Sequence, residues 1–158
     1  MKRNGFTIVE LLIVILVISI LAAITVVAYN GVQNQANDSA VQNDLKNFGK
    51  KMELFKVDNE TYPAAGDITA SLGLRFAKQA YGTDFQGRNV RYCINSSTGE
   101  YVLVANSKSG NYYLVKPGAV VEATVSTYGW GVCNLVGLSS TNPNPNGYSA
   151  GVWAAWTN

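Results

Sequence analysis

The sequence predicts an α+β fold in which one long N-terminal helix packs on a small antiparallel β-sheet and a disulfide holds the C-terminal region. Three observations predict it. An unbroken apolar run begins directly after residue 10, a helical stripe of apolar residues continues behind it, and short β-branched and aromatic runs follow after residue 88. The helix is expected to be apolar in its first half and amphipathic in its second half, so that the second half can cover one face of the sheet.

The apolar run is long enough to cross a membrane. From Leu11 to Tyr29 every residue is apolar or aromatic except Ser19 and Thr25, whose hydroxyl groups can bond to carbonyl groups of their own helix. At ~1.5 Å per residue the run extends about 28 Å, which is close to the thickness of the hydrocarbon core of a bilayer.

The charges around the run predict its orientation. Lys2 and Arg3 precede it, and no charged residue follows it until Asp38. Positive residues stay on the cytoplasmic side, so the N-terminus is expected in the cytoplasm and the bulk of the chain outside. A secretory signal peptide has the same basic start, but this run is longer than a signal core and nothing behind Ala28 resembles a small-residue cleavage site. We therefore expect a permanent anchor.

Behind the anchor the pattern becomes that of an amphipathic helix. Five apolar residues follow one another at spacings of four, three, four and three: Val41, Leu45, Phe48, Met52 and Phe55. This spacing places them in one stripe along a helix. The sequence thus predicts a single helix from about Phe6 to about Val57, with Gly31 and Gly49 as weak points inside it. It is expected to end where Asn59 and Pro63 introduce turn chemistry.

The second half of the chain reads as a sheet. Three β-branched and aromatic runs are separated by turn-like segments: Asn89–Ile94, Tyr101–Ala105 and Asn111–Val115. Short strands joined by tight loops predict an antiparallel meander. Residues Ala119–Tyr128 could form a fourth strand or an irregular crossover, and Ile68–Gln79 could hold a short helix. Residues Ser139–Gly147 are rich in Pro, Asn and Gly and predict a surface loop.

The cysteines point to a disulfide rather than to a reactive site. About 130 residues follow the anchor, enough for one modest core. Cys93 and Cys133 are the only cysteines and there is no histidine. Outside the membrane such a pair is most simply a disulfide, whereas a metal site would need further cysteine or histidine ligands. Without histidine there is no Ser–His or Cys–His pair, so we expect no metal, no cofactor and no enzyme activity.

Two clusters of polar residues are weaker candidates for binding sites. Four oxygen-bearing residues near the predicted helix end could hold calcium: Asp58, Asn59, Glu60 and Asp67. They lack EF-hand spacing, and ordinary turn chemistry is favoured. Four residues could form a basic and aromatic patch for DNA: Arg88, Arg91, Tyr92 and Lys108. The net charge of the chain is only +2, and a solvated sheet edge is favoured there.

The opening KRNGFTIVELLIVILVISILAAI resembles the leader and N-terminal helix of a type IV prepilin. In that family a short basic leader ends in Gly and is cleaved after it, the new N-terminal Phe is N-methylated, and Glu stands at the fifth mature position. Gly5, Phe6 and Glu10 match these positions in register. The resemblance implies a leader peptide at residues 1–5, a transmembrane and filament-core helix at 6–30, and an extracellular pilin domain at 31–158 that includes the rest of the helix.

The resemblance also implies a role for Glu10 in assembly. Cleavage would leave a positive amine on Phe6, which could pair with Glu10 of an adjacent subunit or of its own chain among bundled helices. A buried charge pair specifies register, because leaving one charge unpaired costs several kcal/mol. The alternative is a glutamate that lies among the lipid headgroups without a partner.

Three functions remain open from the sequence. The first is the structural subunit of a type IV pilus, a homopolymer used for adhesion, twitching motility or DNA uptake. Its expected partners are a prepilin peptidase and methyltransferase, the pilus assembly machinery and, before assembly, the cytoplasmic membrane; DNA or a host surface has no clear residue support. The second is a minor pilin or a pseudopilin of a type II-like secretion system. The third is a membrane-anchored binding module that does not polymerise, which would need neither the Gly5–Phe6 junction nor Glu10.

Overall fold

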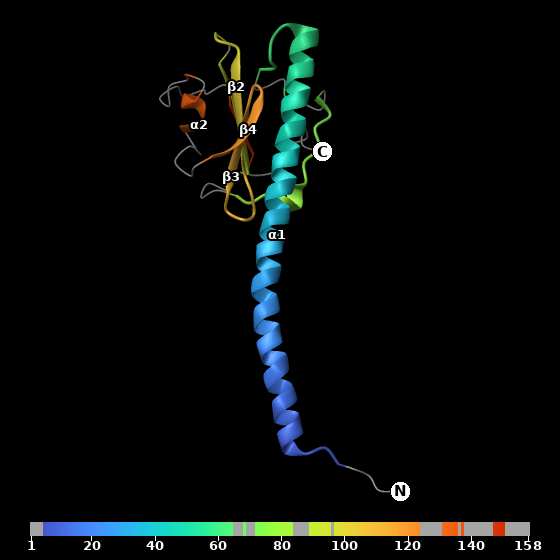
Figure 1. Ribbon diagram of the computed structural model, residues 1–158. Helices are drawn as coiled ribbons and strands as arrows, with labels where there is room; N and C mark the ends of the chain where they lie inside the picture. Colours follow the sequence, from blue (N-terminus) through green and yellow to red (C-terminus); the bar gives the residue numbers. More distant parts are fainter. Residues whose placement is uncertain are drawn as a thin grey trace. The chain divides into compact units, whose positions relative to one another are not determined.

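The computed structural model describes residues 5–64, 68, 72–83, 89–95, 97–123, 131–135, 137 and 147–150 (Figure 1). The chain forms two compact units, Met1–Gln35 and Ala36–Asn158. The predicted fold class is confirmed: the chain has a long N-terminal helix, a small antiparallel sheet and a disulfide.

The long helix α1 (Ile8–Asn59) begins and ends within about two residues of the prediction. The two polar residues within the apolar run Leu11–Tyr29 are satisfied internally, as expected. The Ser19 hydroxyl donates to the Ile15 carbonyl at 2.7 Å, and the Thr25 hydroxyl donates to the Ala22 carbonyl at 3.0 Å. These bonds let two polar residues lie in an apolar surface without unpaired groups.

The end of α1 is closed by local chemistry. The Asn59 side-chain amide donates to the Phe55 carbonyl at 2.9 Å, which satisfies one of the last carbonyl groups of the helix. Glu60 follows with a φ of 62°, the left-handed conformation that usually ends a helix at glycine. A glutamate at this position is strained by about 1–2 kcal/mol relative to glycine.

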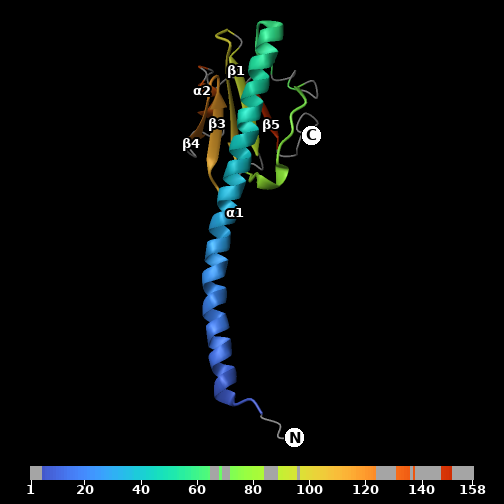
Figure 2. The same ribbon diagram turned by 45° about the vertical axis from the view of Figure 1, so that its right-hand side comes forward.

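The sheet has five antiparallel strands in the order β4-β3-β2-β1-β5 (Figure 2). Their bounds are β1 Val90–Asn95, β2 Glu100–Asn106, β3 Tyr112–Lys116, β4 Ala119–Ala123 and β5 Gly147–Ala150. The first three form the predicted meander, with Tyr92 opposite Leu103 and Leu103 opposite Val115, and β4 continues it. The segment Ala119–Tyr128 thus begins with a fourth strand rather than an irregular crossover.

Two expectations for the connections need correction or extension. The described residues of the segment Ile68–Gln79 show no α-helix; they include Leu72 in 3-10 conformation and the start of the 3-10 turn Lys78–Ala80, and residues 69–71 lie outside the described residues. Strand β5 was not predicted, and it pairs antiparallel with β1, placing Gly147 opposite Cys93. The predicted surface loop Ser139–Gly147 overlaps β5 at Gly147, and its other residues lie outside the described residues.

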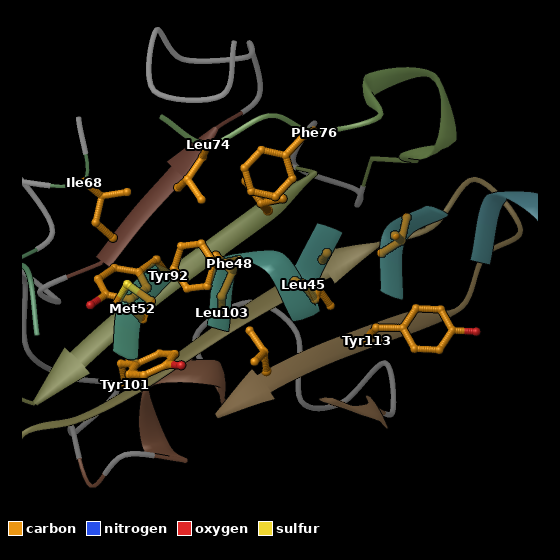
Figure 3. Close-up of a cluster of buried hydrophobic side chains, with 14 of the residues drawn as sticks. Leu45, Phe48, Met52, Ile68, Leu74, Phe76, Tyr92, Tyr101, Leu103 and Tyr113 are labelled. Carbon is orange, nitrogen blue, oxygen red and sulfur yellow. The ribbon is translucent and has the colours of Figure 1, made fainter. Parts of the chain in front are cut away.

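The main core lies between the second half of α1 and one face of the sheet (Figure 3). Leu45, Phe48 and Met52 of the predicted stripe are fully buried. The Phe48 ring makes edge contacts with Tyr92 and Tyr101, with centroids 6.0 and 6.1 Å apart. Aromatic side chains bury large areas, so this contact contributes to the stability of the second unit.

The opposite face of the sheet has its own core, beneath the short helix α2 (Gly131–Asn134). Figure 1 shows the sheet between α1 and α2. Val102, Val104 and Leu114 pack there against Val132 and the two cysteines. The predicted Cys93–Cys133 disulfide is present, with the two Cα atoms 5.3 Å apart. It fastens α2 to the inner strand β1.

Gly49 allows α1 to approach the sheet closely. A Cβ atom at this position would lie 3.2 Å from Cγ2 of Val115 on β3. That distance is shorter than ordinary carbon contacts, so a side chain would push the helix or the strand away. The sequence indicated only the cost of a glycine inside a helix, whereas the structure shows its benefit for packing.

Polar side chains of α1 also fasten it to the loops around the sheet. Asp38 accepts hydrogen bonds from the Ser109 hydroxyl and, at 3.0 Å, from the Asn111 amide. Asp44 accepts bonds from the Ala77 backbone at 2.6 Å and the Tyr81 hydroxyl at 3.1 Å. These bonds join the helix to segments more than 30 residues away in the sequence.

The pKa values of Asp38 and Asp44 are shifted in opposite directions by their surroundings. Burial alone would raise the pKa of Asp38, but its hydrogen bonds together outweigh burial and hold that pKa below the ordinary 3.8. Burial raises the pKa of Asp44 above 3.8, because its two bonds do not fully offset the loss of water. Asp38 is thus held in its charged form when the unit is folded.

Candidate processing and assembly site

The Gly5–Phe6 junction lies just before α1 and is open. Both residues are exposed, and the Phe6 side chain is 77% exposed. A Cβ atom at Gly5 would meet no other atom within 4 Å. The fold therefore does not require glycine at this position, and any such requirement must come from a partner that binds the junction. Residues 1–4 of the predicted leader lie outside the described residues.

Glu10 belongs to a capping box that starts α1. The Thr7 carbonyl accepts the first helical bond, from the Leu11 backbone at 3.3 Å. The Glu10 backbone N–H donates to the Thr7 hydroxyl oxygen at 3.3 Å, and the Thr7 backbone N–H donates to Oε2 of Glu10 at 2.8 Å. The Thr7 hydroxyl also donates to Oε2, at 2.6 Å. Reciprocal bonds of this kind satisfy two backbone donors at once.

The capping box explains why a glutamate stands at position 10: it caps the start of α1. This structural role was not predicted from the sequence. The signal was present, since T-x-x-E directly before an apolar run is the signature of a capping box. Among the described residues, the hydrogen bonds of the Glu10 carboxylate all go to Oε2. Oε1 thus remains available as a second acceptor on the same charged group.

The helix behind Glu10 presents apolar side chains on all sides. The large apolar side chains from Phe6 to Val32 are between 48% and 81% exposed. Within the described residues, α1 is the one helix long and apolar enough to cross a membrane, with a mean hydropathy of 3.2 over its most apolar window. So much exposed apolar surface requires lipid or other protein around it.

The described residues do not support either of the two weaker clusters as a binding site. Asn59 uses its amide to close α1, and Asp67 lies outside the described residues. Among the described residues, no group of three or more possible metal ligands occurs. Arg91 and Tyr92 are 3% and 0% exposed, so neither belongs to a surface patch or to a solvated sheet edge. The sheet-edge interpretation was wrong because β5 pairs with β1 and makes it an inner strand. Arg88 also lies outside the described residues.

Comparison with known proteins decides which family this site belongs to. A family model for the prokaryotic N-terminal methylation motif matches residues 1–26, which include the junction and the capping box. The chain is 32% identical over 113 residues to the type IV wide pilus major component PilA4 of Thermus thermophilus, covering 71% of this chain and 79% of that protein. This chain belongs to the type IV pilin and pseudopilin family.

Pseudopilins are also similar to this chain, and the similarity covers about as much of it as the similarity to PilA4 does. The type II secretion system core protein G of Escherichia coli is 27% identical over 119 residues, covering 74% of this chain and 82% of that protein. The protein of the same name from Klebsiella pneumoniae is 25% identical over 130 residues, covering 81% of this chain and 85% of that protein. The resemblance to type IV prepilins is thereby confirmed at the level of the family. These relatives are named as components of a pilus and of a secretion system, not as enzymes.

Proposed function

We propose that this pilin-family chain is the structural subunit of a type IV pilus. The precursor lies in the cytoplasmic membrane with its N-terminus inside, and it loses residues 1–5. The mature chain then polymerises through the helix at residues 6–30, with residues 31–158 on the outside of the filament. The observation that carries the proposal is the run of exposed residues from Gly5 to Ala36, because identical helices packed together can cover it.

Processing is proposed to occur between Gly5 and Phe6. A prepilin peptidase removes the leader, and Phe6 receives an N-methyl group. The openness of the junction supports this assignment, since a protease needs an accessible and extended segment. The pilus assembly machinery then draws the processed subunit from the membrane.

Glu10 is proposed to set the register between subunits. After cleavage the free amine of Phe6 is adjacent to Thr7, whose backbone N–H and hydroxyl already bond to Oε2 of Glu10. Oε1 can then accept the Phe6 amine of a neighbouring subunit without loss of the helix cap. Among apolar helices an unpaired ammonium would cost several kcal/mol, so only registers that bring the two charges together are stable.

A second candidate is a pseudopilin of a type II-like secretion system, favoured by the similarity to core protein G over most of the chain. A minor pilin present in few copies would share all the features described above. Binding of DNA or of a host surface has no support among the described residues.

Shearing of the native cells distinguishes these candidates. Surface filaments are sheared off, imaged by electron microscopy and separated on a gel, with a strain lacking this chain as control. A major pilin is the main band, and the filaments disappear without it. A minor pilin is a trace band. If sheared filaments persist unchanged in the deletion strain while protein secretion fails, the pseudopilin candidate replaces the pilus proposal.

A further inference from the structure

We propose that two complementary surfaces of the second unit join one copy of this chain to the next. The first is a lysine groove between α1 and the β3–β4 hairpin, and the second is an acidic tip at the end of α1. This inference rests on the proposed function, because it requires copies that stand parallel to one another. It adds the specific surfaces through which the folded units touch.

The lysine groove has an apolar floor and a positive rim. Its volume is about 350 Å³, and it is open where Gly49 of α1 lies against Val115 of β3. Lys46 and Lys50 stand on the helix side of the groove, and Lys116 stands at the end of β3. Within the described part of the chain none of these three lysines forms an ion pair.

The carboxylate in the lining of the groove is already engaged elsewhere. Glu53 accepts a hydrogen bond from the Tyr62 hydroxyl at 2.8 Å. The groove also ends at β4, which is an edge strand of the sheet. The groove therefore offers apolar surface, excess positive charge and open access, and it fits a partner that is apolar with negative groups beside it.

The acidic tip has this chemistry. Leu54 and Val57 are 64% and 79% exposed, and among the described residues from Ala36 onward they are the only exposed large apolar side chains. Asp58 and Glu60 follow them and are also exposed. Both carboxylates lie at the negative end of the helix dipole, and Glu60 occupies a backbone conformation that suits glycine. These acidic residues are unfavourable for their own helix, and a positive partner would offset that.

Two parallel copies can bring these surfaces together. Val57 lies eight residues beyond Gly49 on the same helix, which corresponds to about 12 Å along its axis. A copy displaced by that distance places the tip of one chain level with the groove of the next. Because the two surfaces differ, the contact leaves a free groove and a free tip at the ends and can repeat without closing. We therefore assign the occupant of the groove as a second copy of this chain.

Crosslinking in intact cells tests this contact with the full chain. Val57→Cys and Ala119→Cys are combined, since Ala119 lines the groove and is exposed, and a short bismaleimide is added. The native cysteines are bonded to each other and do not react. We expect a ladder of dimers, trimers and longer products. Asn43→Cys with Ala119→Cys is the matched control, because Asn43 is also exposed on α1 but lies outside the tip.

Charge reversal then tests the chemistry of the contact. Lys116→Glu in the crosslinking background should lower the ladder roughly tenfold, and adding Glu60→Lys should restore it. Lys108→Glu, on the exposed β2–β3 turn, should leave it unchanged. Three results would each overturn this inference and leave the proposed function standing. Filaments could form without the 57–119 ladder, the control pair could crosslink equally well, or Lys108→Glu could lower the ladder as much as Lys116→Glu. A wild-type chain that never enters filaments would overturn the proposed function itself.

Discussion

Removal of the Cys93–Cys133 disulfide should destabilise the second unit strongly. The bond closes a loop with a sequence separation of 40 residues. In the chain-entropy model such a loop contributes about 4 kcal/mol to the free energy of unfolding. The bond also carries α2, which has four residues and is too short to be stable without its attachment to β1.

The expected change in melting temperature follows from the size of the unit. A domain of roughly 120 residues has an unfolding entropy of about 250 cal/mol/K near its midpoint, so a loss of about 4 kcal/mol lowers the midpoint by about 15 °C. The assay is thermal unfolding of a soluble fragment that begins near Gln33, followed by circular dichroism with and without reductant. Cys93→Ala with Cys133→Ala is the second sample, since alanine avoids burying new hydroxyl groups.

Two results would refute this reasoning. The native fragment should contain no titratable thiol, and two free thiols would show that the bond does not form. A midpoint shift below about 4 °C on reduction would show that the loop contributes little to stability. Reductant should have no effect on the double alanine variant, which controls for other actions of the reagent.

Three further predictions concern the processing junction, the assembly residue and the anchoring of α1. Gly5→Val should leave the fold intact and block leader removal, seen as uncleaved precursor on a gel; normal processing would contradict the junction. Glu10→Gln keeps an acceptor for Thr7 but loses the charge, so processed subunits should collect in the membrane with few filaments, and filaments of normal number would show that the charge is not needed. Asp38→Asn should destabilise the soluble fragment at pH 7 by about 1–2 kcal/mol. The folded pKa of Asp38 is below its unfolded value, so its stabilising effect is present above pH 3.8 and is lost as the pH falls through the folded pKa. The variant should therefore lose less stability than the wild type on acidification. Urea unfolding that shows the same loss of stability in both proteins from pH 6 to acid would contradict this.

The sequence predicted the parts of the fold that depend on local periodicity. Leu45, Phe48 and Met52 could be assigned to one buried stripe because a helix repeats every 3.6 residues. The strands of the meander were visible for a similar reason, since each is a short β-branched or aromatic run next to a turn. The ends of α1 and of the strands β1, β2 and β3 were predicted within about two residues.

The features that were missed depend on contacts distant in sequence. The strand β5 contains Gly147 and no β-branched residue, so only its pairing with β1 makes it a strand. The same pairing makes β1 an inner strand, and Arg91, which the sequence places on a solvated sheet edge, is buried. The benefit of Gly49 likewise depends on Val115, 66 positions later in the chain. The capping box of Thr7 and Glu10 is different, because its signature is local and was available in the sequence.

The mass of the N-terminal peptide decides whether this chain is processed and assembled as a pilin-family subunit. The protein is purified from its own cells, digested and analysed by mass spectrometry without prior chemical modification. We predict a mature chain that begins at Phe6 and carries one N-methyl group. A chain that retains Met1–Gly5 in assembled or surface material, or that begins elsewhere without methylation, would contradict the role assigned to Gly5, Phe6 and Glu10.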